Sequence, residues 1–177
     1  MDTFEANWIR SALSEYESAL IRYAVHITRD IEKAREVVQD TFLKLCSQKP
    51  SRLHDHLAQW LFTVCRNRAL DVRRKERRMT ALGDVEVGTA ADGAPEPALL
   101  VQRQEQLEQV LEIMRTLSPN QQEVLRLKFQ NDLSYKQISR ITKLSVTNVG
   151  FLVHTGLKTI REKLETQSGE RVMRRVK

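Results

Sequence analysis

The sequence predicts an all-α protein made of two small helical domains joined by a flexible acidic linker, the second domain ending in a helix-turn-helix. Apolar residues recur at steps of three and four over most of the 177 residues, and no segment alternates with the period of two that is typical of strands. The exception is the segment 80–98, which contains three of the six glycines, two of the four prolines and four acidic residues. No helical stripe continues through this segment, so it is the expected linker.

Two helices are expected at the start of the chain. Apolar residues at helical spacing predict the first helix from about Phe4 to Thr28. Asp30 is a candidate N-cap for the second helix, which is expected to end at Lys49-Pro50-Ser51. The apolar face of this second helix comprises Ile31, Ala34, Val38, Phe42 and Leu45.

A third helix is expected from about Leu57 and runs into the densest positive charge of the chain. Between Arg66 and Arg78, seven of thirteen residues are Arg or Lys. If helical, this run forms a phosphate-binding surface; the alternative is a solvated helix end. Residues 1–78 contain 15 basic and 11 acidic residues, and residues 101–177 contain 14 basic and eight acidic residues. The segment 79–100 between them contains four acidic residues and no basic residue. This distribution, with a net charge of +6, indicates a polyanionic partner.

Helical spacing resumes after the linker with Leu107. Ser118 and Gln121 form an N-terminal capping box around Pro119, and Asn131-Asp132 is expected to end the helix that this box opens. The apolar face of that helix comprises Val124, Leu125, Leu127 and Phe129.

The helix-turn-helix is the most informative pattern. Ser134 and Gln137 form a second capping box, a break follows at Thr142-Lys143-Leu144, and the next helix is expected to start at Ser145. The expected packed side of that helix comprises Val149, Val153, Gly156, Leu157, Ile160 and Leu164. Its outward side comprises Thr147, Asn148, Phe151, Thr155 and Lys158, and has the shape and chemistry to enter a DNA major groove. The polar, basic tail 167–177 is expected to be frayed.

Several function classes find no support in the chain. The two cysteines, Cys46 and Cys65, form no CxxC pair, so reduced and partly buried thiols are expected. His54-Asp55-His56 has no spaced partner for a metal, and no glycine-rich phosphate loop or nucleophile signature is present. The first residues show no basic start followed by an apolar run, so no signal peptide is expected, and no apolar run approaches the ~20 residues that cross a bilayer. We therefore expect a cytoplasmic, non-enzymatic protein without cofactor, metal, small-molecule substrate or membrane insertion.

Three stretches of the sequence carry a family resemblance. They are residues 34–44 (AREVVQDTFLK), residues 60–71 (WLFTVCRNRALD), and Leu117-Ser118-Pro119 with Gln122-Glu123-Val124 and Leu133-Ser134-Tyr135. Together they resemble the small two-domain bacterial sigma factors of the extracytoplasmic-function group. The resemblance implies a core-polymerase and minus-ten binding domain at 1–79, a linker at 80–100, a minus-thirty-five binding domain at 101–166 and a tail at 167–177.

The resemblance implies roles for matched residues of the first domain. Glu36, Gln39 and Asp40 would bind core RNA polymerase, while Phe42 lies on the apolar stripe and is expected in the core. The residues that would face the minus-ten element as it melts are Arg66, Asn67, Arg68, Asp71, Arg73 and Arg74. Weaker candidates for capturing a flipped base are Arg52, His54 and His56, in a loop at about 48–56.

In the second domain, Thr147, Asn148, Phe151 and Thr155 would read the minus-thirty-five element. The residues that would brace its backbone are Tyr135, Lys136, Arg140, Lys143, Lys158 and Arg161. The chain departs from the family at Gly150-Phe151-Leu152, where members usually carry a Lys-Ser-Arg-like triplet. In place of a cation, Phe151 would either contact thymine methyl groups or pack on a neighbouring protein surface.

The partners implied are core RNA polymerase, promoter DNA and an anti-sigma factor. Two alternative functions are a free-standing helix-turn-helix regulator that binds operator DNA as a dimer, and a helical adaptor that binds proteins. The first would explain residues 118–165 but neither the Gln39-Asp40 helix nor the basic run after Arg66.

Overall fold

A computed structural model of the chain describes residues 3–53, 55–80 and 108–175. Within these ranges the regular elements are all helices, which confirms the all-α prediction. The expected linker, apart from Thr80, lies outside the described residues. The chain divides into two compact units, which contain the helices before and after the linker.

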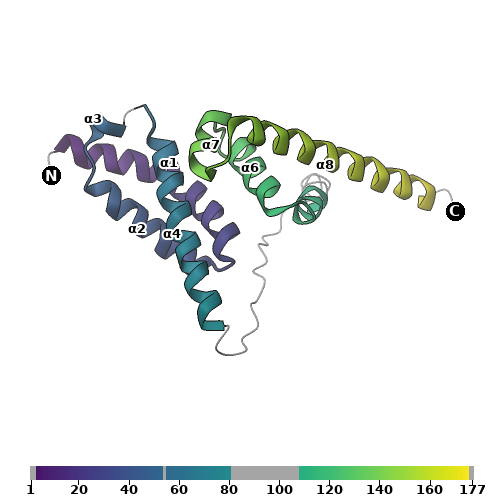
Figure 1. Cartoon of the computed structure of the whole chain (residues 1–177), viewed down its shortest axis with the longest axis horizontal. Coiled ribbons are helices and arrows are strands. Elements are labelled where there is room, and N and C mark those ends of the chain that lie inside the picture. Colours follow the sequence, from purple (N-terminus) through teal and green to yellow (C-terminus); the bar gives the residue numbers. More distant parts are fainter. Residues whose placement is uncertain (1–2, 54, 81–107, 176–177) are drawn as a thin grey trace. The chain divides into compact units, whose positions relative to one another are not determined.

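The first unit consists of α1 (Thr3–Thr28), α2 (Ile31–Cys46), the short α3 (Pro50–Leu53) and α4 (Leu57–Thr80) (Figure 1). The three long helices pack against one another in every pairwise combination. The prediction for the second helix was wrong at its end. α2 stops at Cys46, and Pro50 opens α3 because a proline is well accommodated in a first helical turn.

The junction between α1 and α2 is determined locally. Arg29 adopts a left-handed conformation with φ of 62°, which ends α1. The Asp30 carboxylate then accepts hydrogen bonds from the backbone N–H groups of Glu32 and Lys33, at 2.9 and 3.1 Å. These bonds confirm the predicted cap, and the one from Lys33 is the main reason why the pKa of Asp30 is lowered.

The core of the first unit lies where α1, α2 and α4 meet. The rings of Tyr23 and Phe62 pack edge to face with centroids 5.3 Å apart. Sγ of the buried Cys65 lies 3.9 Å from the backbone oxygen of Leu20, and burial raises the pKa of this thiol to about 12. Cys46 is exposed, contrary to expectation. The other fully buried residues of this core include Leu20, Ala24, Ala34, Leu45, Leu61 and Ala69.

The second unit contains a helical segment at 108–115, then α6 (Pro119–Phe129), α7 (Tyr135–Thr142) and α8 (Val146–Arg175). Both predicted capping boxes are present, at Ser118 with Gln121 and at Ser134 with Gln137. Lys143 closes α7 in a left-handed conformation with φ of 65°, as a helix-turn-helix requires.

Exposure in the second unit differs from the sequence prediction at two apolar positions. Phe129, the last residue of α6, is 60% exposed, and Leu157 of α8 is 40% exposed. α8 continues to Arg175, through most of the tail that was predicted to be frayed. Between Glu165 and Arg175 only Gly169 is a poor helix former, so local propensity favours continuation.

Gly150 and Gly156, two of the three glycines of α8, have different surroundings. A Cβ added at Gly156 would lie 2.9 Å from Cδ1 of Leu125, a buried residue of α6, so smallness permits α6 and α8 to approach closely. At Gly150 the nearest atom would be Cε2 of the Tyr135 ring, at the ordinary contact distance of 3.6 Å. Only Gly156 is required by packing.

We expect Gly150→Ala to raise the free energy of unfolding of the second unit by up to about 1 kcal/mol, because alanine is the better helix former. Gly156→Ala is expected to lower the free energy of unfolding by up to about 2 kcal/mol, because overpacking against Leu125 outweighs the same gain. Urea denaturation followed by circular dichroism measures both. Equal stabilisation by the two substitutions would contradict the close α6–α8 contact.

Candidate protein and nucleic-acid interfaces

The outward side of α2 is a mixed polar and apolar face. Glu36 and Gln39 are exposed. Leu43, which lies about one turn after Gln39 and two turns after Glu36, is 62% exposed. Phe42 is only 6% exposed, which confirms its expected place in the core. Sequence reasoning missed Leu43, although its spacing of seven from Glu36 and four from Gln39 indicates the same face.

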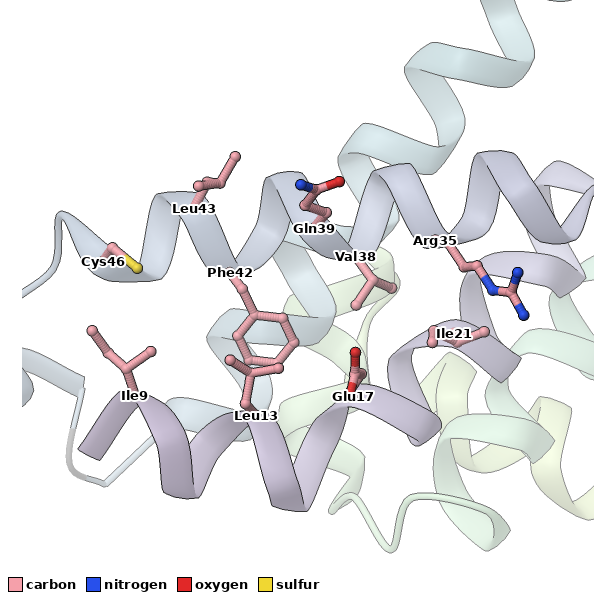
Figure 2. Close-up of a pocket in the computed structure, with 10 residues that line it drawn as sticks. All are labelled: Ile9, Leu13, Glu17, Ile21, Arg35, Val38, Gln39, Phe42, Leu43 and Cys46. Atoms are coloured by element: carbon pink, nitrogen blue, oxygen red, sulfur yellow. The ribbon is translucent and has the colours of Figure 1, made fainter. Parts of the chain in front are cut away.

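A groove of about 460 Å³ lies between α1 and α2 beside this face. Figure 2 shows Phe42 and Val38 directed toward α1, with the Phe42 ring next to Leu13, whereas Gln39 and Leu43 point away from α1. The groove is lined by Ile9, Leu13, Glu17 and Ile21 of α1 and by Arg35, Val38, Gln39, Phe42, Leu43 and Cys46 of α2.

A second hollow, of about 500 Å³, lies between α2 and α4. Nε of Arg68 donates a hydrogen bond to the Asp40 carboxylate at 2.7 Å across it. Leu43 lines both hollows and therefore forms a ridge between them. The remaining lining residues are Lys44, Ser47, Asn67 and Asp71. The ion pair joins one predicted polymerase-binding residue to one predicted DNA-binding residue.

The predicted minus-ten residues occupy two sides of α4. Asn67, Asp71 and Arg74 are exposed at helical spacing, and Arg74 pairs with Asp71 at 3.1 Å. Arg73 is half-buried on another side. Burial lowers the pKa of Arg73, and the neighbouring guanidinium groups of Arg77 and Arg29 lower this pKa further. The Arg73 guanidinium nonetheless keeps its charge at neutral pH.

The candidates for base capture are only partly described. Arg52 and His56 are exposed on either side of the buried Leu53, and His54 lies outside the described residues. In the described part of the chain, no three His, Cys, Asp or Glu side chains gather as a metal site requires. None of the helices described there is long and apolar enough to cross a membrane.

The outward side of α8 carries most of the predicted reading residues. Thr147, Asn148, Phe151 and Lys158 are all exposed, with Phe151 at 63%. Lys158 lies 3.8 Å from the Glu162 carboxylate. His154 is also exposed on this side, three residues after Phe151, and sequence reasoning did not include it.

Thr155 faces the domain rather than the centre of the outward side. It is half-buried, and its hydroxyl accepts a hydrogen bond from Nε2 of Gln121 in α6 at 3.1 Å. The same hydroxyl donates to the backbone oxygen of Phe151 at 2.9 Å. Thr155 therefore holds α8 on α6 in this structure.

The predicted bracing residues are exposed around the helix-turn-helix. Tyr135 and Lys136 begin α7, and the hydroxyl of Ser139 donates to the backbone oxygen of Leu144 at 2.6 Å, which holds the turn. The other exposed members of this set are Arg140, Lys143 and Arg161. Lys136, Arg140 and Lys143 place positive charge just before the start of α8, whereas Arg161 lies about four turns further along that helix.

Comparison with known families matches both units. The model of sigma-70 region 2 matches residues 12–79, and the model of sigma-70 region 4 matches residues 107–160. The first match spans most of α1 to α4, and the second ends within α8.

Individual proteins of known name are also similar. The extracytoplasmic-function RNA polymerase sigma factor SigM of Bacillus subtilis is 30% identical over 135 residues, covering 75% of this chain and 80% of that protein. SigL of Mycobacterium tuberculosis, from the same group, is 28% identical over 166 residues, covering 91% of each. Among solved structures, the sigma factor RpoE in complex with the anti-sigma factor NepR, from Bartonella quintana, has the same fold. The two structures superpose with a TM-score of 0.70 and share 24% sequence identity, and the match covers 88% of this chain and 96% of that chain.

Proposed function

We propose that three surfaces of this chain divide the work of promoter-directed transcription initiation, because the chain belongs to the extracytoplasmic-function sigma factors of the sigma-70 family. As a member of that family, it is an RNA polymerase sigma factor that binds core RNA polymerase and promoter DNA. A free-standing regulator is not favoured, because the region 2 match accounts for residues 12–79 of the first unit, which such a regulator would not need.

The outward face of α2 binds core polymerase in this proposal. Glu36 and Gln39 supply hydrogen-bonding groups, and the exposed Leu43 supplies an apolar anchor between two hollows. A central apolar side chain surrounded by polar groups is typical of a protein interface. Asp40 belongs to the edge of this face, because its carboxylate is shared with Arg68.

The exposed side of α4 binds the minus-ten element as it opens. Asn67 and Asp71 present groups that hydrogen-bond base edges, and Arg68 and Arg74 lie beside them as phosphate ligands. Arg66 and Arg73, both half-buried, lie on other sides of α4 and hold the strand as it leaves this surface. The first domain extends over 1–79 and is joined through 80–100 to the second domain, 101–166.

The outward side of α8 reads the minus-thirty-five element in the major groove through Thr147, Asn148 and Phe151. The exposed residues around the turn and further along α8 bind the phosphates: Tyr135, Lys136, Arg140, Lys143, Lys158 and Arg161. In this assignment, Thr155 holds the reading helix on α6 and has no base contact.

Three further statements belong to the proposal. An anti-sigma factor covers one or more of these surfaces, by analogy with the Bartonella quintana protein that was solved with one. The chain supplies binding rather than catalysis, since the polymerase carries the chemistry. It works in the cytoplasm, where the polymerase and the promoter are.

Transcription of genomic DNA by purified core polymerase tests this proposal. We expect added chain to direct initiation at a small set of start sites that share upstream elements, mapped by sequencing the transcript ends. The observation that carries the proposal is the match of regions 2 and 4 to the two units of one chain. Identical start sites with and without the chain would contradict it.

A further inference from the structure

The N-terminal turns of α8 contain no lysine or arginine. From Ser145 to Leu157 no such residue occurs, and Lys158 is the first cation of the helix. Residues at the start of a recognition helix make the base contacts, and a bidentate Arg or Lys is the usual ligand of guanine. This reading surface therefore lacks the side chains that normally select a G·C pair.

Aromatic surface takes the place of these cations. Phe151 is 63% exposed at the middle of the outward side. Since each residue of an α-helix turns about 100° around the helix axis, Phe151 lies within about 40° of both Thr147 and Lys158. The Tyr135 ring of α7 rests on Gly150, at 3.6 Å from the position of a Cβ, and is itself partly exposed. A second aromatic ring therefore lies at the same end of α8.

Asn148 lies three residues before Phe151 on the same face of the helix, and its side chain can form hydrogen bonds with a ligand. Its backbone N–H is held by the Ser145 hydroxyl at 3.2 Å, and its side chain is exposed. Among the described residues, no hydrogen bond to the Asn148 amide group is present. The amide is therefore available to a base.

We propose that Asn148 and Phe151 together select adjacent A·T pairs in the minus-thirty-five element, Asn148 by binding adenine and Phe151 by contacting a thymine methyl group. An amide matches the N6 donor and N7 acceptor of adenine, and thymine presents the only methyl group in the major groove. Tyr135 borders the same apolar surface. The inference rests on the proposed role of α8 and specifies the bases that α8 recognises.

The test uses holoenzyme, assembled from the full chain and core polymerase, and a promoter fragment with a pre-melted minus-ten region. The minus-thirty-five element is first selected from a pool randomised only at those positions. In the selected duplex, each thymine is then replaced by deoxyuridine, which removes only the methyl group, and each adenine by 7-deazaadenine, which removes only N7. Binding is compared for the wild type, Phe151→Ala, Asn148→Ala and Phe129→Ala.

Phe129→Ala is the matched control, because Phe129 is also about 60% exposed but ends α6. For the wild type and this control, we expect deoxyuridine at one thymine to weaken binding roughly fourfold, the ratio for burying one methyl-sized group. Phe151→Ala is expected to bind both duplexes equally while keeping its response to 7-deazaadenine. Asn148→Ala is expected to show the reverse pattern.

Selection of G·C pairs, or a deoxyuridine response that persists in Phe151→Ala, would overturn the inference while leaving the sigma-factor role intact. So would a loss of core-polymerase affinity in Phe151→Ala with no dependence on the methyl group, since Phe151 would then pack on a protein. Failure of the holoenzyme to enrich any upstream sequence would instead count against the role of α8 itself.

Discussion

Replacing Gln39 and Leu43 together by alanine is expected to weaken binding of core RNA polymerase by roughly 30-fold, or about 2 kcal/mol. Leu43 is 62% exposed on the ridge between two hollows, so its side chain is available to a partner. A few well-packed residues near the centre of an interface, surrounded by contacts that exclude water, contribute much of its affinity. Fluorescence anisotropy of labelled protein titrated with core polymerase measures the change.

The matched control is Gln130→Ala with Leu157→Ala in the second unit. These are the same two side-chain truncations as in the α2 variant, but at the exposed Gln130, which is the C-cap of α6, and at the exposed Leu157 of α8. We expect this variant to bind core polymerase like the wild type. Unchanged affinity of the α2 variant, with its helical content intact, would remove the outward face of α2 from the polymerase interface.

Replacing Arg68 and Arg74 together by alanine is expected to lower affinity for the melted minus-ten strand on the order of 100-fold at low salt, as two charged hydrogen bonds are lost. Each lost contact to a single-stranded phosphate also flattens the dependence of log affinity on log salt by about 0.7, so the slope should fall by about 1.4. Holoenzyme binding to a bubble promoter, measured from 50 to 300 mM salt, gives both quantities.

Two controls separate local contacts from net charge. Arg10→Ala with Arg22→Ala removes the same charge from exposed positions of α1 and should leave the slope nearly unchanged. Asp40→Ala releases Arg68 from its 2.7 Å ion pair and should preserve DNA binding when core polymerase is present in saturating excess. An equal loss for the α1 and α4 variants would mean that only the total charge of the chain matters.

Local sequence determined where most helices begin and how they are capped. Asp30, Ser118 and Ser134 were each predicted as caps, and each accepts the expected backbone hydrogen bonds. These motifs depend on side chains reaching backbone groups two or three residues away, so no distant part of the chain is needed to form them. The family resemblance was visible for the same reason, because its motifs are short and continuous.

Neighbours in space decided which side chains are available at the surfaces. Periodicity placed Phe42, Phe129 and Leu157 on apolar stripes, but only Phe42 is covered by another helix. Thr155 was predicted to face DNA; in the structure it is half-buried, and its hydroxyl accepts a hydrogen bond from Gln121 of α6.

The pairing of Asp40 with Arg68, 28 residues apart, likewise depends on α2 packing beside α4. A helical pattern in the sequence specifies the direction in which a side chain points from the helix axis. Whether that side chain is buried or paired depends on which other helix packs in that direction. The sequence by itself therefore determined the helices, their caps and the family of this protein. The tertiary structure left Leu43 of α2 and Phe151 of α8 exposed and partly buried Thr155 against α6, because only the packing of neighbouring helices covers a side chain.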